Sequence, residues 1–319
     1  MNITVLDGYT TNPGDLSWDN LSDLGQTTIY DRSPRETIAS RLSETEIAVS
    51  NKVVWDAELF DQAPHLKMIA LLSTGFNVVD LQEAKRRGVL VANVPAYSTP
   101  DVAQMTFALL LEITNQVATH AQSVKEGAWC SCPDFTYSLT PLIELSGKTL
   151  GIIGMGSIGQ AVAKIAQAFD MKVLFANRSQ KPACENASTT QVDLETLLRQ
   201  ADVISLHCPA TPETENIINE STLALMKPGA IVLNTARGTL VDEAAMAAAL
   251  QSGHIAAFGA DVVSTEPMIE NNPLKEAPHT FITPHIAWAT KEARQRLLDT
   301  VACNIKSYLE GHPQNIVSE

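Results

Sequence analysis

The sequence predicts an α/β protein built from two doubly wound parallel-sheet domains. Short apolar runs alternate with helix-like polar stretches along the whole chain, which is typical of crossover units in a mainly parallel sheet. The chain has 319 residues, of which 45% are hydrophobic and 18% charged, so it is long enough for two domains with cores of their own.

The first ninety or so residues are expected to form one α/β domain. Five apolar runs predict strands at residues 3–6, 27–30, 46–50, 68–72 and 89–92. The stretches between them predict helices at residues 16–24, 34–42, 57–61 and 79–87.

A domain boundary is predicted near Ser98, because Pro95 and Pro100 bracket a turn and residues 102–123 follow as one long helix. Residues 129–145 are irregular, and three aromatic side chains in them are expected to be exposed: Trp129, Phe135 and Tyr137. This segment is either an arm that packs on a second subunit or a loop folded over its own domain.

The centre of the chain carries the motif G-x-G-x-x-G, formed by Gly154, Gly156 and Gly159. The first glycine permits a tight turn, the second lets a pyrophosphate approach the backbone, and the third allows close packing of a helix on a strand. The helix that follows offers unpaired N–H groups and a positive dipole end, which favour phosphate.

The surroundings of this motif favour dinucleotide binding over a purely structural turn. An apolar strand, residues 149–153, precedes it, and a second strand, residues 172–176, follows the helix. The helix is amphipathic, with a stripe expected to face the sheet at Ile158, Val162, Ile165 and Phe169. A Rossmann-type domain is therefore predicted here.

The alternation resumes after this unit and continues to the end of the chain. Strands are predicted at residues 203–207, 231–233, 255–260 and 281–283, and helices at 194–199, 221–226, 243–251 and 291–309. Asp242 is expected to cap the helix that Gly253 ends. The last helix is expected to cross back to the first domain, so the predicted domains are residues 1–98 with 290–319, and residues 99–289.

Composition excludes several classes of partner. The formal net charge of −14 argues against nucleic acid, which needs clustered Lys and Arg. No apolar run reaches membrane-spanning length, and Asp7 interrupts any secretory signal, so we expect a cytoplasmic protein. Five cysteines without a C-x-x-C predict neither a disulfide framework nor a metal site; Cys130 and Cys132 are either a redox pair or incidental loop thiols.

Polar residues that directly follow apolar strands are the candidates for chemistry, because ligands sit beyond the carboxyl ends of parallel strands. Arg237 can present a planar fork to a carboxylate, which suggests an acid as substrate. His285 can exchange a proton near neutral pH, and Glu266 would stabilise its charged form and fix its tautomer. Ser73, Thr74 and Gly75 would add donors to the substrate carboxylate.

Over nearly its full length the chain resembles the D-isomer-specific 2-hydroxyacid dehydrogenase family, and most of all its glycerate dehydrogenase or hydroxypyruvate reductase branch. The matching stretches are LLSTGFNVVD from Leu71, GIIGMGSIGQ from Gly151, DVISLHCPATPET from Asp202, MKPGAIVLNTARGTLVDEAA from Met226, DVVSTEP from Asp261 and TPHIAWAT from Thr283.

The resemblance implies a hydride transfer between a nicotinamide cofactor and a small D-2-hydroxy or 2-oxo acid, such as hydroxypyruvate or glyoxylate giving D-glycerate or glycolate. It implies that Arg237 binds the carboxylate, that Glu266 supports His285, and that His285 is the acid/base. It also implies a homodimer whose active site lies between the Rossmann-type cofactor domain and a flavodoxin-like substrate domain, into which the cofactor domain is inserted. The implied cofactor contacts are Gly154, Met155, Gly156, Ser157, Ile158, Gly159, Asn177, Arg178, Ser179, His207, Cys208, Pro209, Thr214, Thr235, Ala236, Arg237, Asp261, His285 and Ala287.

One departure bears on the choice of coenzyme. Members that use NAD usually end the second strand with Asp or Glu, whereas Asn177 stands here, followed by Arg178 and Ser179. Asn removes the charge that would repel a 2′-phosphate. The sequence therefore favours NADP(H), with NAD(H) as the alternative if Asn177 still holds the ribose.

Two other kinds of protein share this fold or resemble this family. A nucleotide-sensing corepressor shares this fold, but Arg237, Glu266 and His285 together favour an enzyme. Formate dehydrogenases resemble the family and typically carry Gln where Glu266 stands, so Glu266 disfavours that function. Phe76, Trp55 and Trp288 either line the substrate pocket or belong to the core, so the sequence does not select the 2-oxo acid.

Overall fold

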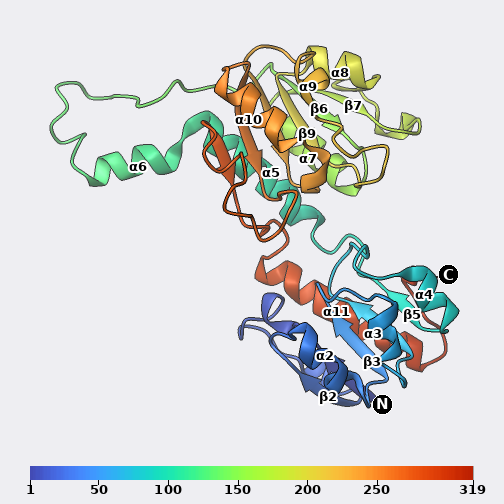
Figure 1. Ribbon diagram of the computed structural model, residues 1–319. Helices are drawn as coiled ribbons and strands as arrows, with labels where there is room; N and C mark the ends of the chain where they lie inside the picture. The colour runs from blue at the N-terminus through green and yellow to red at the C-terminus, as the bar shows by residue number, and fades with distance from the viewer. Residues whose placement is uncertain (319) are drawn as a thin grey trace. The chain divides into compact units, whose positions relative to one another are not determined.

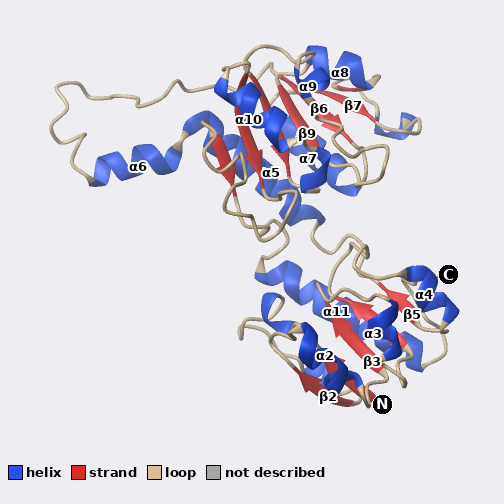
Figure 2. Ribbon diagram, in the orientation of Figure 1, coloured by secondary structure: helices blue, strands red, loops and turns tan. Residues whose placement is uncertain are grey.

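The computed structural model describes residues 1–318 and divides into two compact units (Figure 1). Unit 1 comprises Met1–Ser98 with Trp288–Glu319, and unit 2 comprises Thr99–Ala287. Each unit has a parallel sheet with helices on both faces (Figure 2), which confirms the predicted fold class.

Unit 1 is built on a five-stranded sheet in the order β2-β1-β3-β4-β5, with every pair parallel. This is the flavodoxin-like order. Its strands are β1 (Asn2–Val5), β2 (Gln26–Ile29), β3 (Ile47–Ser50), β4 (Met68–Leu71) and β5 (Leu90–Ala92). Its helices are the 3₁₀ turn η1 (Gly8–Thr10), α1 (Asp19–Ser22), α2 (Arg35–Leu42), α3 (Ala57–Asp61), α4 (Leu81–Arg86) and α11 (Lys291–Leu309).

The C-terminal helix α11 covers one face of this sheet together with α1. Leu297, Leu298, Val301 and Ile305 are buried in one cluster with Ile3 and other strand residues. Helical spacing places these four side chains on one stripe of α11. The opposite face is covered by α2, α3 and α4. Unit 1 is therefore complete only when the two ends of the chain come together.

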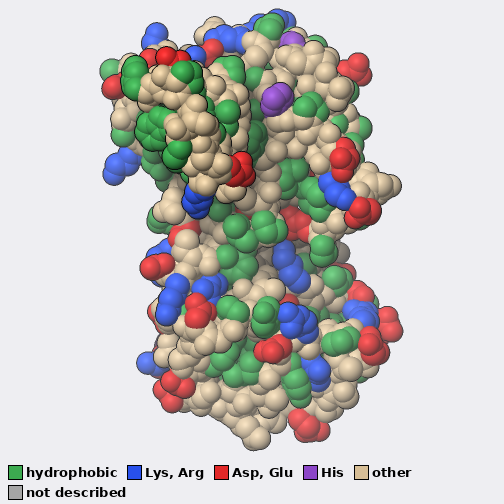
Figure 3. Space-filling view, turned by 90° about the vertical axis from the view of Figure 1, so that its left-hand side faces the viewer, with side chains coloured by type: hydrophobic (Ala, Val, Ile, Leu, Met, Phe, Trp, Pro, Cys, Tyr) green, Lys and Arg blue, Asp and Glu red, His purple; other side chains and the backbone are tan. Residues whose placement is uncertain are grey.

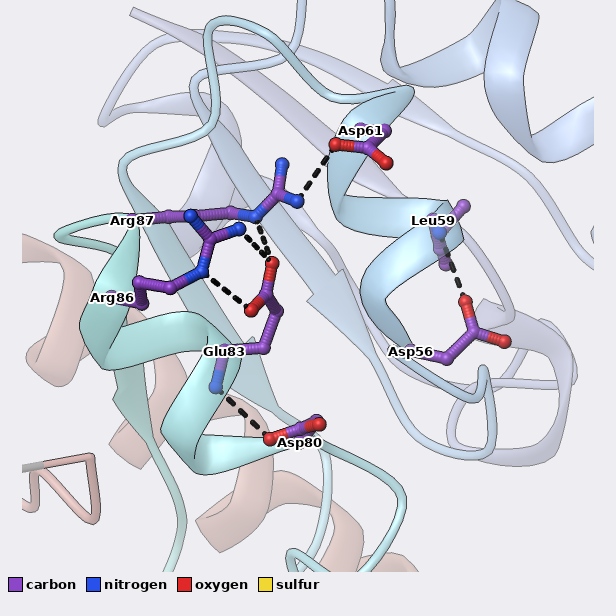
Figure 4. Close-up of polar contacts among 7 residues, drawn as sticks. All are labelled: Asp56, Leu59, Asp61, Asp80, Glu83, Arg86 and Arg87. Carbon is purple, nitrogen blue, oxygen red and sulfur yellow. Dashed lines mark hydrogen bonds and ion pairs between the residues drawn. The ribbon is translucent and has the colours of Figure 1, made fainter.

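Acidic side chains organise the starts of α3 and α4 (Figure 4). Asp56 accepts a hydrogen bond from the Leu59 amide at 2.9 Å, and Asp80 accepts one from the Glu83 amide at 3.0 Å. The Glu83 carboxylate in turn binds Arg86 and Arg87, and these two guanidinium groups lower its pKa to about 2. Each helix thus begins at a side-chain cap that satisfies an otherwise unpaired amide.

Unit 2 is built on a seven-stranded parallel sheet in the order β12-β11-β10-β9-β6-β7-β8. Its strands are β6 (Thr149–Ile153), β7 (Lys172–Ala176), β8 (Thr189–Gln191), β9 (Val203–Leu206), β10 (Ala230–Asn234), β11 (Ile255–Ala260) and β12 (Thr280–Ile282). Its helices are α5 (Thr99–Asn115), α6 (Val117–Lys125), α7 (Ser157–Ala168), η2 (Pro182–Cys184), α8 (Leu194–Gln200), α9 (Glu220–Leu223), η3 (Gly238–Leu240) and α10 (Glu243–Gln251). The order from β8 to β11 is that of a Rossmann domain, and α5 and α7 cover one face while α8, α9 and α10 cover the other.

The single long helix predicted over residues 102–123 is wrong. Two helices occur instead, and they meet at Gln116, whose φ of 44° is left-handed. The Thr114 carbonyl accepts a hydrogen bond from the Ile143 amide at 3.1 Å, so a distant segment takes a group that a continuous helix would have used. Beyond this point α6 buries none of its residues.

The apolar stripe predicted on α7 is correct only in part. The buried residues of α7 are Gly159, Val162, Ala163 and Ala166. Phe169 does not face the sheet, because its ring stacks on Phe107 of α5 with a centroid distance of 5.5 Å and is 38% exposed. Strand β8 was missed altogether, since Thr189–Gln191 has no apolar run to reveal it.

Candidate active site

The three glycines of the turn between β6 and α7 have different surroundings. Gly154 has a φ of +100°, and a Cβ there would lie 2.6 Å from the Cys208 amide nitrogen. A Cβ on Gly159 would lie 2.3 Å from the Gly154 carbonyl oxygen. A Cβ on Gly156, by contrast, would meet nothing within 4 Å. The first and third glycines thus serve the fold, while the second keeps open the space before Ser157 and Ile158, where the first turn of α7 has unpaired amides.

The side chain of Asn177 ties the glycine turn to the end of β7. Its Oδ1 accepts a hydrogen bond from the Met155 amide at 3.2 Å, and its Nδ2 donates to the Ser179 carbonyl at 3.0 Å. Arg178 and Ser179 are exposed. No carboxylate therefore occupies the position that usually meets the adenosine ribose.

The segment after β9 closes the far side of the glycine turn. The His207 amide donates to the Ile153 carbonyl at 2.8 Å, and the His207 ring is bonded to the Ser205 hydroxyl at 2.7 Å. Burial lowers the pKa of His207 to about 3, so the ring is neutral, and it raises the pKa of the Cys208 thiol. The following loop folds on itself, because the Thr214 hydroxyl donates to the Pro209 carbonyl at 2.7 Å.

Buried Asn234 shapes the loop that carries Arg237 after β10. Its Nδ2 donates to the Arg237 carbonyl at 2.8 Å, and its Oδ1 accepts from the Ala236 amide at 3.0 Å. The Thr235 hydroxyl is bonded to that of Thr106 on α5 at 3.0 Å. Arg237 is exposed, and one of its guanidinium nitrogens donates to the Ala236 carbonyl at 2.6 Å.

The structure brings Glu266 and His285 together. The Glu266 Oε2 and the His285 Nδ1 are 2.6 Å apart. An ionised carboxylate only accepts hydrogen bonds, so Nδ1 carries the proton and Nε2 is the ring nitrogen suited to proton exchange. The pair is partly open to solvent, with side-chain exposures of 29% for His285 and 31% for Glu266.

Asp261 holds the loop in which His285 lies. This carboxylate is 1% exposed and accepts from the Thr283 hydroxyl at 2.6 Å, the Ile286 amide at 2.9 Å and the Ala287 amide at 2.7 Å. His285 itself has a left-handed φ of 55°, which is uncommon for a residue with a side chain. Both oxygens of Asp261 accept hydrogen bonds from the histidine loop, and its predicted contact with the cofactor stays a prediction.

Ser73, Thr74 and Gly75 follow β4 in unit 1, and their loop is held by the segment after β5. The Thr74 hydroxyl donates to the Val94 carbonyl at 2.6 Å, and Asn93 Nδ2 donates to the Thr74 carbonyl at 2.7 Å. Trp55, a candidate for the pocket wall, is instead fully buried in the core of this unit. Phe76 is 40% exposed and Trp288 is partly buried.

Sequence reasoning passed over the supporting role of two residues at the site, one of which, Asp261, was predicted only as a cofactor contact. Asn234 and Asp261 anchor its loops, and nothing but their place at the end of a strand marks them in the sequence. Among the described residues no group of three His, Cys, Asp or Glu side chains could hold a metal ion. No described helix is both long and apolar enough to span a membrane.

The chain is similar to known proteins over most of its length. Residues 107–287 match the family model described as the D-isomer specific 2-hydroxyacid dehydrogenase, NAD binding domain. A hydroxypyruvate reductase of Blautia hydrogenotrophica is 49% identical over 322 aligned residues, which cover 100% of both chains.

Two solved structures resemble both units of the chain. An acyclic imino acid reductase, Bsp5, in complex with NADPH and D-Arg has a TM-score of 0.87 and 33% identity and covers 99% of this chain and 100% of its own. A D-lactate dehydrogenase from Aquifex aeolicus complexed with NAD and lactic acid has a TM-score of 0.86 and 30% identity, with coverage of 100% and 99%.

An added methyl group should change the free energy of unfolding differently at the second and at the third glycine of the motif. Gly159→Ala should lower the free energy of unfolding by about 1–3 kcal/mol, because its Cβ meets backbone that has to move. Gly156→Ala should leave it nearly unchanged, because its Cβ enters open space. Urea unfolding of both variants measures this, and equal destabilisation would contradict the roles given to the two glycines.

Proposed function

The chain belongs to the D-isomer-specific 2-hydroxyacid dehydrogenase family, and on that premise we propose that it transfers a hydride between a nicotinamide coenzyme and a small 2-oxo or D-2-hydroxy acid. The observation that carries the proposal is the 2.6 Å contact between His285 Nδ1 and Glu266 Oε2, beyond the carboxyl ends of the sheet that holds the glycine turn. Such a pair suits a group that has to hold and release a proton.

The roles of the side chains follow from their chemistry. A bound nicotinamide coenzyme supplies the hydride. His285 Nε2 donates a proton to the carbonyl oxygen of the 2-oxo acid during reduction and takes it back during oxidation. Glu266 keeps the other ring proton on Nδ1 and stabilises the charged ring. Arg237 binds the substrate carboxylate through its planar fork and polarises the carbonyl, which stabilises the negative charge that develops there.

We propose hydroxypyruvate or glyoxylate as the 2-oxo acid, giving D-glycerate or glycolate. The support is the full-length similarity to a hydroxypyruvate reductase and the exposed guanidinium of Arg237, which can receive one carboxylate. Arg237, Glu266 and His285 are all present, so a corepressor without turnover is not favoured.

We propose NADP(H) as the preferred coenzyme. Asn177 leaves the end of β7 without a negative charge, and Arg178 and Ser179 are exposed beside it. NAD(H) is the second candidate, because the charge of Arg178 also interacts with the carboxylate of Glu213. The pKa of Glu213 is lowered mainly by a hydrogen bond from Thr211, with Arg178 adding a smaller attraction.

We also propose that the chain forms a homodimer through α6 and the segment up to residue 145. Figure 1 shows this segment projecting from unit 2, and Figure 3 looks onto it, with hydrophobic side chains gathered there in the upper half of the view. Val117 is 62% exposed, Trp129 52% and Phe135 89%. Within the segment, His120 accepts a hydrogen bond from the Leu139 amide at 3.0 Å, and the Ser123 hydroxyl is bonded to that of Tyr137 at 2.6 Å. A segment with several exposed apolar side chains suits a second copy of the same segment.

His285→Ala should lower kcat by about 10²–10⁴-fold, because no other group replaces the proton donor. Coenzyme affinity, measured by nucleotide fluorescence, should change little. The exposed His312→Ala is the control and should behave as wild type. Near-normal turnover of His285→Ala would remove this residue from the mechanism.

Coenzyme choice can be read from kcat/KM with NADPH and NADH and one 2-oxo acid. Wild type should prefer NADPH, and Arg178→Ala should reduce kcat/KM for NADPH by about tenfold while leaving NADH nearly unaffected, since only the phosphate contact is lost. A strong NADH preference of the wild type would refute the assignment.

The proposed dimer predicts that Phe135→Asp weakens self-association, because a charge would be buried in the interface. Sedimentation equilibrium at micromolar concentration should show a dimer for wild type and a shift to monomer for the variant. Val54→Asp, on an exposed valine of unit 1, is the control. A monomeric wild type would rule out the dimer.

A further inference from the structure

The carboxylate of Glu243 binds the loop that carries Glu266. Glu243 is the first residue of α10, but Asp242 already caps that helix by accepting from the Ala245 amide at 3.0 Å. Glu243 instead reaches across to Ser264. Its Oε1 accepts from the Ser264 amide and its Oε2 from the Ser264 hydroxyl, both at 2.7 Å.

The same carboxylate also holds the other end of this loop. Its Oε2 accepts a third hydrogen bond, from Asn272 Nδ2 at 2.9 Å. Asn272 is 3% exposed, and its Oδ1 accepts from the amide of buried Leu274 at 2.9 Å. The loop from residue 264 to 272 therefore starts and ends on Glu243, with Glu266 between the two attachment points.

The loop that carries Arg237 contacts the peptide between Val263 and Ser264 from another side. A Cβ on Gly238 would lie 1.9 Å from the Val263 carbonyl carbon and 2.3 Å from the Ser264 nitrogen, so the two backbones are in direct contact. The Val263 amide also faces Glu266 Oε1 at 3.4 Å. The place of the Glu266 carboxylate is thus set by the peptide that Glu243 and Gly238 hold.

We propose that Glu243 is a positioning residue, which holds the loop of residues 264–272 so that Glu266 reaches His285 Nδ1. This inference rests on the proposed function, in which Glu266 fixes the tautomer of the histidine. It adds that the proton chemistry depends on a carboxylate that touches neither the histidine nor the substrate.

The chemistry of the three bonds makes Glu243→Gln informative. All three partners of the carboxylate donate, and the Ser264 hydroxyl alone can turn round to accept. A glutamine offers one acceptor and one donor group, so either the Ser264 amide or Asn272 Nδ2 must face an N–H group. Asn272 cannot flip to relieve this, because its Oδ1 already serves the Leu274 amide.

The direct readout is the ring tautomer of His285, measured by NMR of the full-length protein labelled with ¹⁵N-histidine and assigned by loss of the signal in His285→Gln. In wild type the neutral ring should carry its proton on Nδ1. Glu243→Gln should shift it towards the Nε2 tautomer and lower kcat on the order of tenfold. Glu220→Gln, at the matching first position of α9, should leave both at wild-type values.

A second substitution tests the mechanism by rescue. In the double variant Glu243→Gln/Asn272→Asp, the carboxylate introduced at position 272 can accept from the new glutamine amide while still accepting from Leu274. The glutamine oxygen can then accept from the Ser264 amide, so the tautomer and most of kcat should return. Should Glu243→Gln fail to fold, Ser264→Ala removes one bond only, and a smaller shift in the same direction is expected.

Glu266→Ala, which removes the acceptor of the Nδ1 proton, separates this inference from the function on which it rests. If that variant shifts the tautomer while Glu243→Gln and Ser264→Ala do not, Glu243 is merely structural and the inference is overturned. The inference is also overturned if the double variant recovers neither the Nδ1 tautomer of His285 nor any of the lost kcat. If Glu266→Ala itself leaves the tautomer unchanged, the couple of Glu266 and His285 and the proposed function fail together.

Discussion

The parallel direction of all seven strands in unit 2 is the constraint on which the site depends. Parallel strands place their carboxyl ends along one edge of the sheet, so the loops after β6, β9, β10 and β11 open on the same side. The glycine turn, the loop that carries Arg237 (the arginine loop) and the loop of residues 264–272 that carries Glu266 (the glutamate loop) come from segments far apart in the sequence. Strand order alone makes them neighbours, and their side chains only have to adjust locally.

Local adjustment is achieved by polar side chains behind each loop. Asn234 holds the arginine loop, Asp261 the histidine loop and Glu243 the glutamate loop, each through two or three hydrogen bonds to groups that would otherwise be unpaired. Asn234 and Asp261 are buried, so their contacts are shielded from water, whereas the contacts of Glu243 with Ser264 are exposed. The left-handed backbone of His285 is stable in this setting because the amides on its C-terminal side are bound to Asp261.

The sequence was informative where one residue type has one physical use. Glycines that no side chain can replace, apolar runs and the helix cap at Asp242 predicted the core elements within a few residues. It was misleading where tertiary contacts decided the outcome. The helix breaks at Gln116, where the amide of distant Ile143 binds the Thr114 carbonyl. Phe169 stacks on Phe107 of α5 in place of facing the sheet. The supporting roles of Asp261 and Glu243 also escaped notice, because a carboxylate that binds backbone amides looks in the sequence like one that binds a ligand.

The central claim is that one guanidinium and one supported imidazole act on the same small acid. It is tested most directly by a crystal structure of the protein with NADP⁺ and the unreactive substrate analogue oxamate. We predict two parallel hydrogen bonds from Arg237 to the carboxylate of the analogue, and a hydrogen bond from His285 Nε2 to its carbonyl oxygen. An analogue bound away from both side chains, with Glu266 still on His285 Nδ1, would contradict the assignment.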